Sequence, residues 1–350
     1  MGAAALLVRR RIASDRVTDR AMAGSSIPLS VELLESSTTD QPLIVKIATL
    51  PTTSLPTCLH KLLELVFFAE EEPAFLSITN LANSTLTIVA DVESIDALKS
   101  VVGEPLEIDE TDHCVVRVGE GSCGFESIGV VERLTEPLAN AGISVLYIST
   151  YSTDYVLLPR ERRDEALDCL PWRSGAAQPS APADEPRRAA AGHTHPLTMF
   201  NSSPSHVVRL EKRHRQRHTG ALLRLLFMPQ RSDNVQAIAS LTETSDEISI
   251  IASADEKSWW AEYMRENAMD AGMTSDPQEW VPIRVGEQEG TPLSEIGVIA
   301  TQARVLASAN VSILYLSTFF SDFTLVQRAD VSRAAEAFET AGLLLTTVTT

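Results

Sequence analysis

The sequence is poor in aromatic residues and cysteines, and it has no long apolar run. Aromatic residues make up 5% of the 350 residues, and the four cysteines are Cys58, Cys114, Cys123 and Cys169. No two of them have zinc-ligand spacing, and sparse unpaired cysteines are typical of a reducing compartment. No apolar stretch approaches the ~20 residues that a membrane helix needs. We therefore expect a cytoplasmic protein that does not insert into a membrane.

Positive charge is also scarce. The chain has 29 Lys and Arg against 47 Asp and Glu, which gives a formal net charge of −18. An acidic surface repels phosphate backbones, so we do not expect nucleic-acid binding. The most basic stretch, RLEKRHRQR at residues 209–217, has no aromatic side chain that could stack on bases. We interpret this stretch as a solvated strand end or loop.

Sequence motifs of catalysis are absent as well. The sequence has no GxSxG, Walker A, HExxH or spaced GxGxxG pattern. The run GEGSCG at residues 119–124 is rich in glycine but lacks the lysine of a phosphate-binding loop. His193 and His195 are a weak metal signal, because no third ligand is nearby. We therefore expect a protein that is not an enzyme and needs no cofactor.

What the sequence does contain is an internal repeat. Residues 115–158 and 283–326 share RVGE, then IGV, and then the block S-[VI]-L-Y-[IL]-S-T-[YF] at nearly constant spacing. An earlier block repeats more weakly, as LLELVFF at residues 62–68 and LLRLLFM at residues 222–228. These matches predict four sub-blocks, two in each of two similar halves.

Composition sets the expected boundaries of the two halves. Hydrophobic residues make up 44% and charged residues 22%, which are globular proportions. Residues 173–205 are rich in Pro, Ala, Ser and Arg and show no hydrophobic period, so they predict a linker. We expect a disordered arm at residues 1–40, a first half at 41–172, a disordered linker at 173–205 and a second half at 206–350.

Periodicity predicts the same order of elements in each repeat. In the first copy we expect a strand at residues 115–118, a glycine loop, a helix at 126–141 closed by Gly142, strands at 143–148 and 154–158, and a helix at 160–170. The second copy ends in a helix at 331–341 and a last strand in LLLTTVTT. This order predicts an α+β fold of ferredoxin-like βαββαβ modules in two pseudo-symmetric halves.

The repeat also offers a ligand pocket. A helix N-terminus after the glycine loop can hold a carboxylate, and an acid after the hairpin turn, Asp154 or Asp322, can hold a cationic group. Together these groups suit a zwitterionic amino acid. The alternative is that Asp154 and Asp322 only cap their own turns. The repeated helix glycines, Gly129 and Gly297, are interpreted as positions where the helix packs closely on the sheet.

The runs GFESIGVV…ISVLYISTYSTDYVLL and LLRLLFMPQRS…VSILYLSTFFSDFTLV resemble the CASTOR family of cytosolic arginine sensors, which are tandem ACT-domain proteins. The resemblance covers residues 43–170 and 206–342. Residues 206–342 look like the N-terminal half of the family and residues 43–170 like its C-terminal half. The two halves are therefore expected in exchanged order.

The resemblance implies that arginine binds between ACT modules of the two halves. Matching positions imply that Ser312 and Ile313 hold the α-carboxylate, Gly124 and Val130 line the α-amino end, Thr150 and Tyr151 offer carbonyls to the guanidinium, and Asp154 pairs with it. Where the family has a Glu near the α-amino group this chain has Ser127, and Glu295 occupies the equivalent place in the other half.

The resemblance also implies a partner. Phe319, Phe320 and Asp322 match a family surface for partner binding, and arginine would change binding to a GATOR-type complex upstream of the TOR kinase. A homodimer is expected as well. Two alternatives stay open: an interaction module that binds no ligand, and a regulatory module for an amino-acid biosynthetic enzyme.

Overall fold

A computed structural model describes most of the chain. The described residues are 30–36, 41–69, 72–81, 84–119, 128–170, 195–228, 237–254, 258–267, 272–286 and 295–348. None of the described helices is long and apolar enough to span a membrane.

In the described part of the first half, the structure has four α-helices and eight strands. The helices are α1 (Leu55–Phe67), α2 (Val92–Val102), α3 (Val130–Asn140) and α4 (Arg163–Cys169), and the strands are β1 (Val31–Leu33), β2 (Ile44–Pro51), β3 (Phe75–Leu81), β4 (Thr85–Asp91), β5 (Glu107–Ile108), β6 (His113–Val118), β7 (Leu146–Ser149) and β8 (Asp154–Pro159).

The second half repeats this order. Its helices are α5 (Arg215–Phe227), α6 (Trp259–Glu266), α7 (Val298–Ser308) and α8 (Val331–Thr340), and its strands are β9 (Leu197–Phe200), β10 (Ser205–Leu210), β11 (Ile238–Thr244), β12 (Ile248–Ser253), β13 (Met273–Ser275), β14 (Trp280–Val285), β15 (Ile313–Ser317), β16 (Asp322–Gln327) and β17 (Leu345–Val348). Within each half, the order strand, helix, strand, strand, helix occurs twice. The α+β class and the duplication are therefore confirmed.

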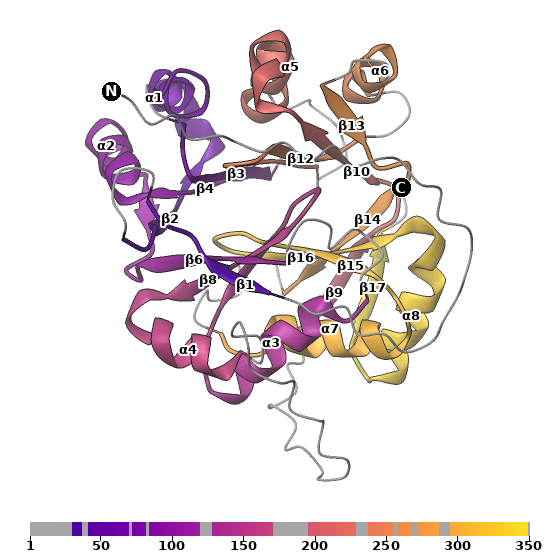
Figure 1. The fold of residues 1–350 in the computed structure, drawn as a ribbon. Coiled ribbons are helices and arrows are strands. Elements are labelled where there is room, and N and C mark those ends of the chain that lie inside the picture. The colour runs from indigo at the N-terminus through magenta and orange to yellow at the C-terminus, as the bar shows by residue number, and fades with distance from the viewer. Residues whose placement is uncertain are drawn as a thin grey trace, which may run out of the picture.

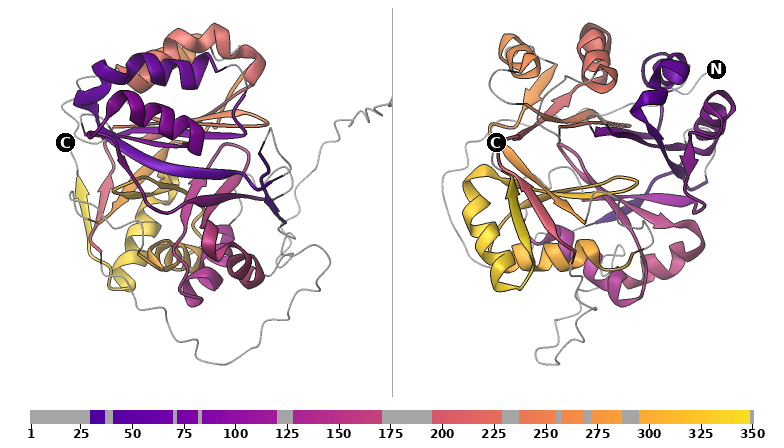
Figure 2. Two further views of the ribbon diagram at one scale, coloured as in Figure 1. Left: turned by 90° about the vertical axis from the view of Figure 1, so that its left-hand side faces the viewer. Right: turned by 180° about the vertical axis from the view of Figure 1, so that it is seen from behind.

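The strands lie in two central layers with the helices outside. Helices α1, α2, α5 and α6 cover one layer, and α3, α4, α7 and α8 cover the other (Figure 1). Figure 2 shows the same layers from the side and from behind. The buried residues of α1 show why such helices form, because Leu55, Cys58, Leu62 and Val66 recur every three or four positions along one face.

The pairings close the two layers into a ring. Twelve strands pair in the circuit β2–β4–β3–β11–β12–β10–β14–β16–β15–β7–β8–β6 and back to β2. The space inside this flattened ring is filled by apolar side chains from both halves, among them Ile47, Phe75 and Trp280. The ring is thus a packed core that ties the two halves together.

The halves meet at two antiparallel seams. Strand β3 pairs with β11 over seven residues, and buried hydroxyl pairs cross this seam, Ser77 to Thr242 at 2.9 Å and Thr79 to Ser240 at 2.8 Å. The second seam joins β7 to β15, where Ile148 lies opposite Leu316. The Tyr147 amide donates to Ser317 Oγ at 3.1 Å, and the Tyr315 amide donates to Ser149 Oγ at 2.9 Å. These reciprocal bonds make the second seam nearly two-fold symmetric.

Two expected boundaries were wrong. Strand β1 lies within the arm expected at residues 1–40, and β9 lies within the linker expected at 173–205. Each adds a strand to the second repeat of its half, β1 on β6 and β9 on β14, so pairing with a strand far along the chain orders segments that have no hydrophobic period of their own. The remaining parts of these two segments lie outside the described residues.

The basic stretch at residues 209–217 begins as a strand end, as expected, but two of its basic side chains are not solvated. It contains the end of β10, a short 3-10 turn and the start of α5. The side chains of Lys212 and Arg215 are only 12% and 15% exposed, and both pair with the buried carboxylate of Glu243. Burial raises the pKa of Glu243, while the charges of Arg215 and Lys212 oppose this. The basic side chains therefore neutralise a buried acid.

The glycines before α3 and α7 have a different role from the expected one. Gly129 has φ 79° and Gly297 has φ 84°, both in the left-handed region that only glycine adopts readily. A Cβ on Gly129 would come no closer than 3.8 Å to its neighbours, so close packing does not require glycine there. Helix α3 accordingly starts at Val130, four residues later than expected.

Candidate functional site

A narrow slot lies between the two halves, beside the β7–β15 seam. It is lined from the first half by Thr135, Ala139, Ile143, Val145 and Leu146, and from the second half by Glu295, Gly297, Val298, Ile299, Ala300, Thr318, Ser321 and Asp322. The elements that meet there are α3, the start of β7, the N-terminus of α7 and the turn between β15 and β16. The enclosed space is about 20 Å³, enough for one water molecule.

The N-terminus of α7 lies at the slot. Val298, Ile299 and Ala300 form its first turn and line the slot. The N–H groups of a first turn have no acceptor within the helix, and the helix dipole adds partial positive charge there. Gly297 turns the chain into this helix through its left-handed conformation. This end of the slot is therefore suited to a carboxylate.

The β15–β16 turn contributes an acid. Thr318 Oγ1 donates to the Ser321 carbonyl at 2.6 Å, and the Thr318 amide donates to the same oxygen at 2.9 Å. Asp322 follows the turn and is half-buried. Burial raises the pKa of Asp322 to about 6, although hydrogen bonds with the Ser317 and Tyr315 side chains lower it. A half-buried carboxylate with a raised pKa lacks a full counter-charge, so a cation at this position would be stabilised.

A second acid, Glu295, lines the other side of the slot. Its carboxylate lies 2.8 Å from His195 Nε2, and its backbone carbonyl accepts from Ser144 Oγ at 3.3 Å. The negative charge of Glu295 also raises the pKa of Asp322, because the two carboxylates repel each other. His195 belongs to no metal site among the described residues, where no group of three or more His, Cys, Asp or Glu side chains could hold an ion.

The residues predicted from the sequence to bind the ligand are the repeat counterparts of positions at this slot, and we call their location the twin site. Gly124 and Ser127 lie outside the described residues. Val130 starts α3, Ser312 and Ile313 lie at the start of β15, and Thr150, Tyr151 and Asp154 belong to the β7–β8 turn. The antiparallel β7–β15 pairing directs the start of β15 toward this turn, so these groups share one side of the seam.

Asp154 closely parallels Asp322. Its carboxylate accepts from the Tyr147 hydroxyl at 2.9 Å. Burial raises its pKa to about 6, while hydrogen bonds from Ser149 and Tyr147 lower it. The two equivalent turns therefore each carry an acid whose pKa is raised to about 6.

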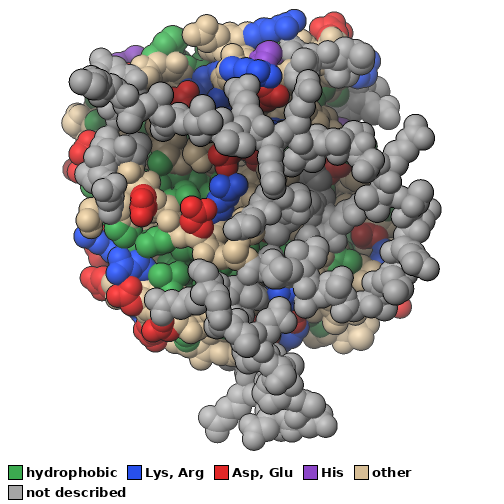
Figure 3. Space-filling view, in the orientation of Figure 1, with side chains coloured by type: hydrophobic (Ala, Val, Ile, Leu, Met, Phe, Trp, Pro, Cys, Tyr) green, Lys and Arg blue, Asp and Glu red, His purple; other side chains and the backbone are tan. Residues whose placement is uncertain are grey.

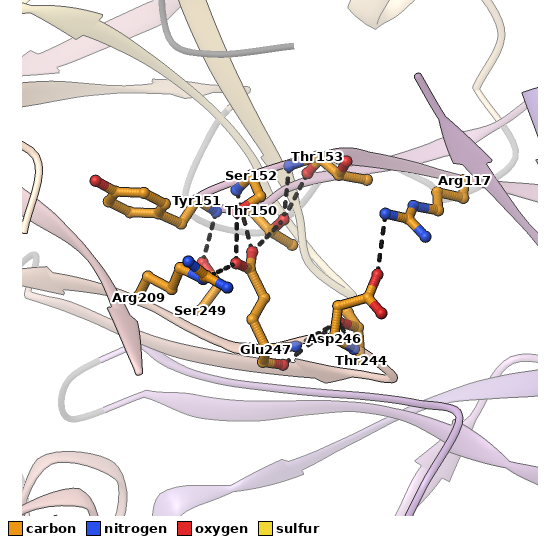
Figure 4. A network of polar contacts seen from close by, with 10 residues as sticks. All are labelled: Arg117, Thr150, Tyr151, Ser152, Thr153, Arg209, Thr244, Asp246, Glu247 and Ser249. Carbon is orange, nitrogen blue, oxygen red and sulfur yellow. Dashed lines mark hydrogen bonds and ion pairs between the residues drawn. The ribbon is translucent and has the colours of Figure 1, made fainter. Parts of the chain in front are cut away.

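The β7–β8 turn is bound by the opposite half through a network that the sequence did not indicate (Figure 4). The carboxylate of Glu247, which is 3% exposed, accepts from the Ser152 amide at 3.0 Å, from Ser152 Oγ at 2.5 Å and from Thr150 Oγ1 at 3.3 Å. It also pairs with Arg209 Nε at 2.9 Å, and the Tyr151 amide donates to Ser249 Oγ at 2.9 Å. Glu247 was missed because it lies far from this turn along the chain.

The residues predicted for partner binding lie at the β15–β16 turn. The rings of Phe319 and Phe320 pack against each other with centroids 4.9 Å apart. Phe319 also packs against the apolar core inside the ring. Acidic and basic side chains are interspersed on the visible part of the face in Figure 3, without a broad basic patch among the described residues there.

Comparison with known proteins shows what this chain is similar to. A family model described as "ACT domain" matches residues 109–171 and 276–340. The human protein named "Cytosolic arginine sensor for mTORC1 subunit 1" is 26% identical over 308 residues, covering 80% of this chain and 90% of the relative. Its rat counterpart is 25% identical over 299 residues, covering 78% and 87%. A solved aspartate kinase from Synechocystis overlaps with a TM-score of 0.30 at 13% identity, covering 92% of this chain and 57% of the kinase.

The chain is therefore an ACT-domain protein with two matched copies of the domain. Over most of its length it is similar to the cytosolic arginine sensors, at 25–26% identity. One point of the resemblance needs correction. Matches that cover 80% of one chain and 90% of the other run in a single order along both, whereas exchanged halves would limit a match to about half of each chain. The halves are thus not exchanged.

Proposed function

We propose that this protein is a non-catalytic, cytosolic sensor of arginine, and that the ligand binds in the slot beside Asp322. The observation that carries the proposal is the pairing in one slot of two carboxylates, Glu295 and Asp322, with the free amides of the α7 N-terminus. An amino acid with a cationic side chain has one carboxylate and two cationic groups, which match these three features in sign.

Several positions in or beside the slot are the repeat counterparts of residues predicted from the family resemblance. Ser144 and Val145 take the places of Ser312 and Ile313 at the ligand carboxylate, and Thr318, Phe319 and Asp322 take those of Thr150, Tyr151 and Asp154 at the guanidinium. Val298 stands in the place of Val130 at the amino end.

The acid near the α-amino group supports the choice of slot. Family members have a Glu there, and this chain has it only as Glu295, since Ser127 stands at the matching place of the twin site. Because the halves run in the same order as in the relatives, the slot with Glu295 also lies in the matching half. We therefore assign the ammonium group of the ligand to Glu295.

Calorimetric titration with three ligands tests this proposal. Arginine is expected to bind, citrulline to bind much more weakly because its ureido group carries no charge for Asp322, and agmatine to bind weakly because it has no carboxylate for the α7 N-terminus. If arginine and citrulline bind equally well, Asp322 does not hold the guanidinium. If the protein binds no amino acid at all, the proposed sensor function is rejected.

The small size of the slot favours one alternative, an ACT-domain interaction or regulatory module that binds no arginine. A space of about 20 Å³ cannot hold an amino acid unless the surrounding groups move. Absence of binding in the titration above, together with amino-acid-independent capture of a partner, would support this alternative.

The partner of the sensor is also part of the proposal. The relatives' name refers to mTORC1, so a GATOR-type complex of the TOR pathway is proposed as the partner, with Phe319 and Phe320 in its contact surface. Pull-down of this complex with and without arginine tests it, since the proposal requires the captured amount to change with arginine. A homodimer is proposed as well, and light scattering of the purified chain tests it.

A further inference from the structure

The two halves present the same short turn at equivalent places. In the β7–β8 turn Thr150 Oγ1 donates to the Thr153 carbonyl at 2.6 Å, and in the β15–β16 turn Thr318 Oγ1 donates to the Ser321 carbonyl at 2.6 Å. Each turn also donates one amide to a hydroxyl of the opposite half. The Phe319 amide reaches Thr87 Oγ1 at 3.2 Å, just as the Tyr151 amide reaches Ser249 Oγ. The turns therefore share their internal bonds and their docking.

The two turns differ in a single set of contacts. Glu247 lies two residues before Ser249 on its hairpin, and the residue two before Thr87 is Thr85. Arg209 lies opposite Ser249 in the strand register, and the residue opposite Thr87 is Thr49. The half that faces the β15–β16 turn thus has threonine in place of both members of the ion pair.

The missing carboxylate leaves the β15–β16 turn less tightly held. The Ser152 amide donates to Glu247 at 3.0 Å, whereas its counterpart, the Phe320 amide, has no acceptor among the described residues. Hydrogen bonds to an ionised carboxylate are stronger than neutral ones, and the Glu247 carboxylate is 3% exposed, so water screens them little. The β7–β8 turn is therefore held by a carboxylate, whereas the β15–β16 turn, among the described residues, has one neutral hydrogen bond to the opposite half besides the packing of Phe319.

This difference matters because the slot is too small in this structure for an amino acid. Thr318, Ser321 and Asp322 of the β15–β16 turn line it, so a shift of this turn widens it. The equivalent shift in the twin site would have to break the contacts of Ser152 and Thr150 with Glu247. The twin site thus has the same turn and the same acid but cannot open in the same way.

We propose that Glu247 is a positioning residue that fixes the β7–β8 turn, keeps the twin site closed and leaves the β15–β16 turn as the element that moves when ligand binds. The identity of the ligand rests on the function proposed above, but the difference between the turns does not. The proposal therefore has one test that needs no ligand and one that does.

The first test is amide hydrogen exchange of the wild-type protein without ligand. The Ser152 amide is expected to exchange at least about tenfold more slowly than the Phe320 amide. Glu247→Thr should accelerate exchange at Ser152 and leave Phe320 unchanged, while Glu247→Gln should have a smaller effect because its amide oxygen still accepts. Equal protection of Ser152 and Phe320 in the wild-type protein would overturn the proposal, whatever the protein binds.

The second test gives the β15–β16 turn a carboxylate equivalent to that of Glu247. Thr85→Glu places a carboxylate opposite the Phe320 amide and Thr318 without altering any residue that lines the slot, and Thr85→Gln is its uncharged control. Thr85→Glu should slow Phe320 exchange and weaken arginine binding at least about tenfold relative to Thr85→Gln. Slower exchange at Phe320 together with undiminished arginine affinity would refute the role of the turn in opening the slot. If the wild-type protein binds no arginine, the proposed arginine-sensor function is rejected. The hydrogen-exchange test alone then decides whether Glu247 fixes the β7–β8 turn.

Discussion

Replacing Asp322 by Asn should stabilise the protein without ligand at neutral pH. The pKa of Asp322 is raised from 3.8 to about 6, so the folded state holds its proton more tightly than the unfolded state. Between these two pKa values the stability falls as the pH rises, and above about pH 6 the whole cost of the buried charge is present. Asn carries no charge and avoids this cost.

The size of the effect follows from the pKa shift. A rise from 3.8 to about 6 corresponds to at most roughly 3 kcal/mol, and water that reaches the half-buried side chain reduces this figure, so we expect a gain of about 1–2 kcal/mol at pH 7. At about pH 4 the wild-type acid is largely protonated in the folded state, and the gain should nearly vanish. Stabilisation only at neutral pH would show that the site keeps a charge at the expense of stability.

Urea denaturation at both pH values measures this difference. Asp154→Asn is the matched comparison, because the pKa of Asp154 is also raised to about 6 and the same stabilisation at neutral pH is expected. If Asp322→Asn lowers the free energy of unfolding by the same amount at both pH values, the reasoning from a buried uncompensated charge is refuted.

Three further predictions concern the slot and the seam. Arginine affinity should fall by up to about tenfold per pH unit below about pH 6, because protonation of Asp322 removes its charge, and calorimetry that finds constant affinity between pH 7.5 and about pH 5 would contradict this. Gly297→Ala should cost about 1–2 kcal/mol because φ is 84° there, and denaturation showing no loss would contradict a strained α7 entry. Leu316→Ala, at a side chain that is 0% exposed in the β7–β15 seam, should cost about 2–5 kcal/mol in the same assay, and a loss comparable to that of a surface substitution would show that the seam is not part of the core.

The local fold could be predicted because the repeat appears twice in local patterns. The alternation and helical spacing around residues 115–158 recur in the second half, so each strand and helix there had an independent second observation. The positions of β1 and β9 could not be predicted in this way. Both are short strands whose order comes from pairing with β6 and β14, which lie far away along the chain.

The sequence predicts a ligand site beside Asp154, whereas we propose the equivalent slot beside Asp322. The repeat showed that Asp154 and Asp322 are equivalent acids, and no local pattern distinguishes them. The features that do distinguish them are long-range. Glu247 comes from a hairpin about a hundred residues away from its turn, and His195 reaches Glu295 across a similar distance. Such contacts follow from the closed ring of strands and leave no periodic signal in the sequence.

The position of the ligand is tested most directly by titrating arginine into two variants, Asp322→Asn and Asp154→Asn. The side chains are isosteric in both substitutions, both acids have a pKa raised to about 6, and they are related by the symmetry of the seam. Arginine binding should be lost in Asp322→Asn and should remain within a few-fold of the wild-type affinity in Asp154→Asn. Loss of binding in Asp154→Asn with binding kept in Asp322→Asn would place the ligand in the twin site and contradict the account.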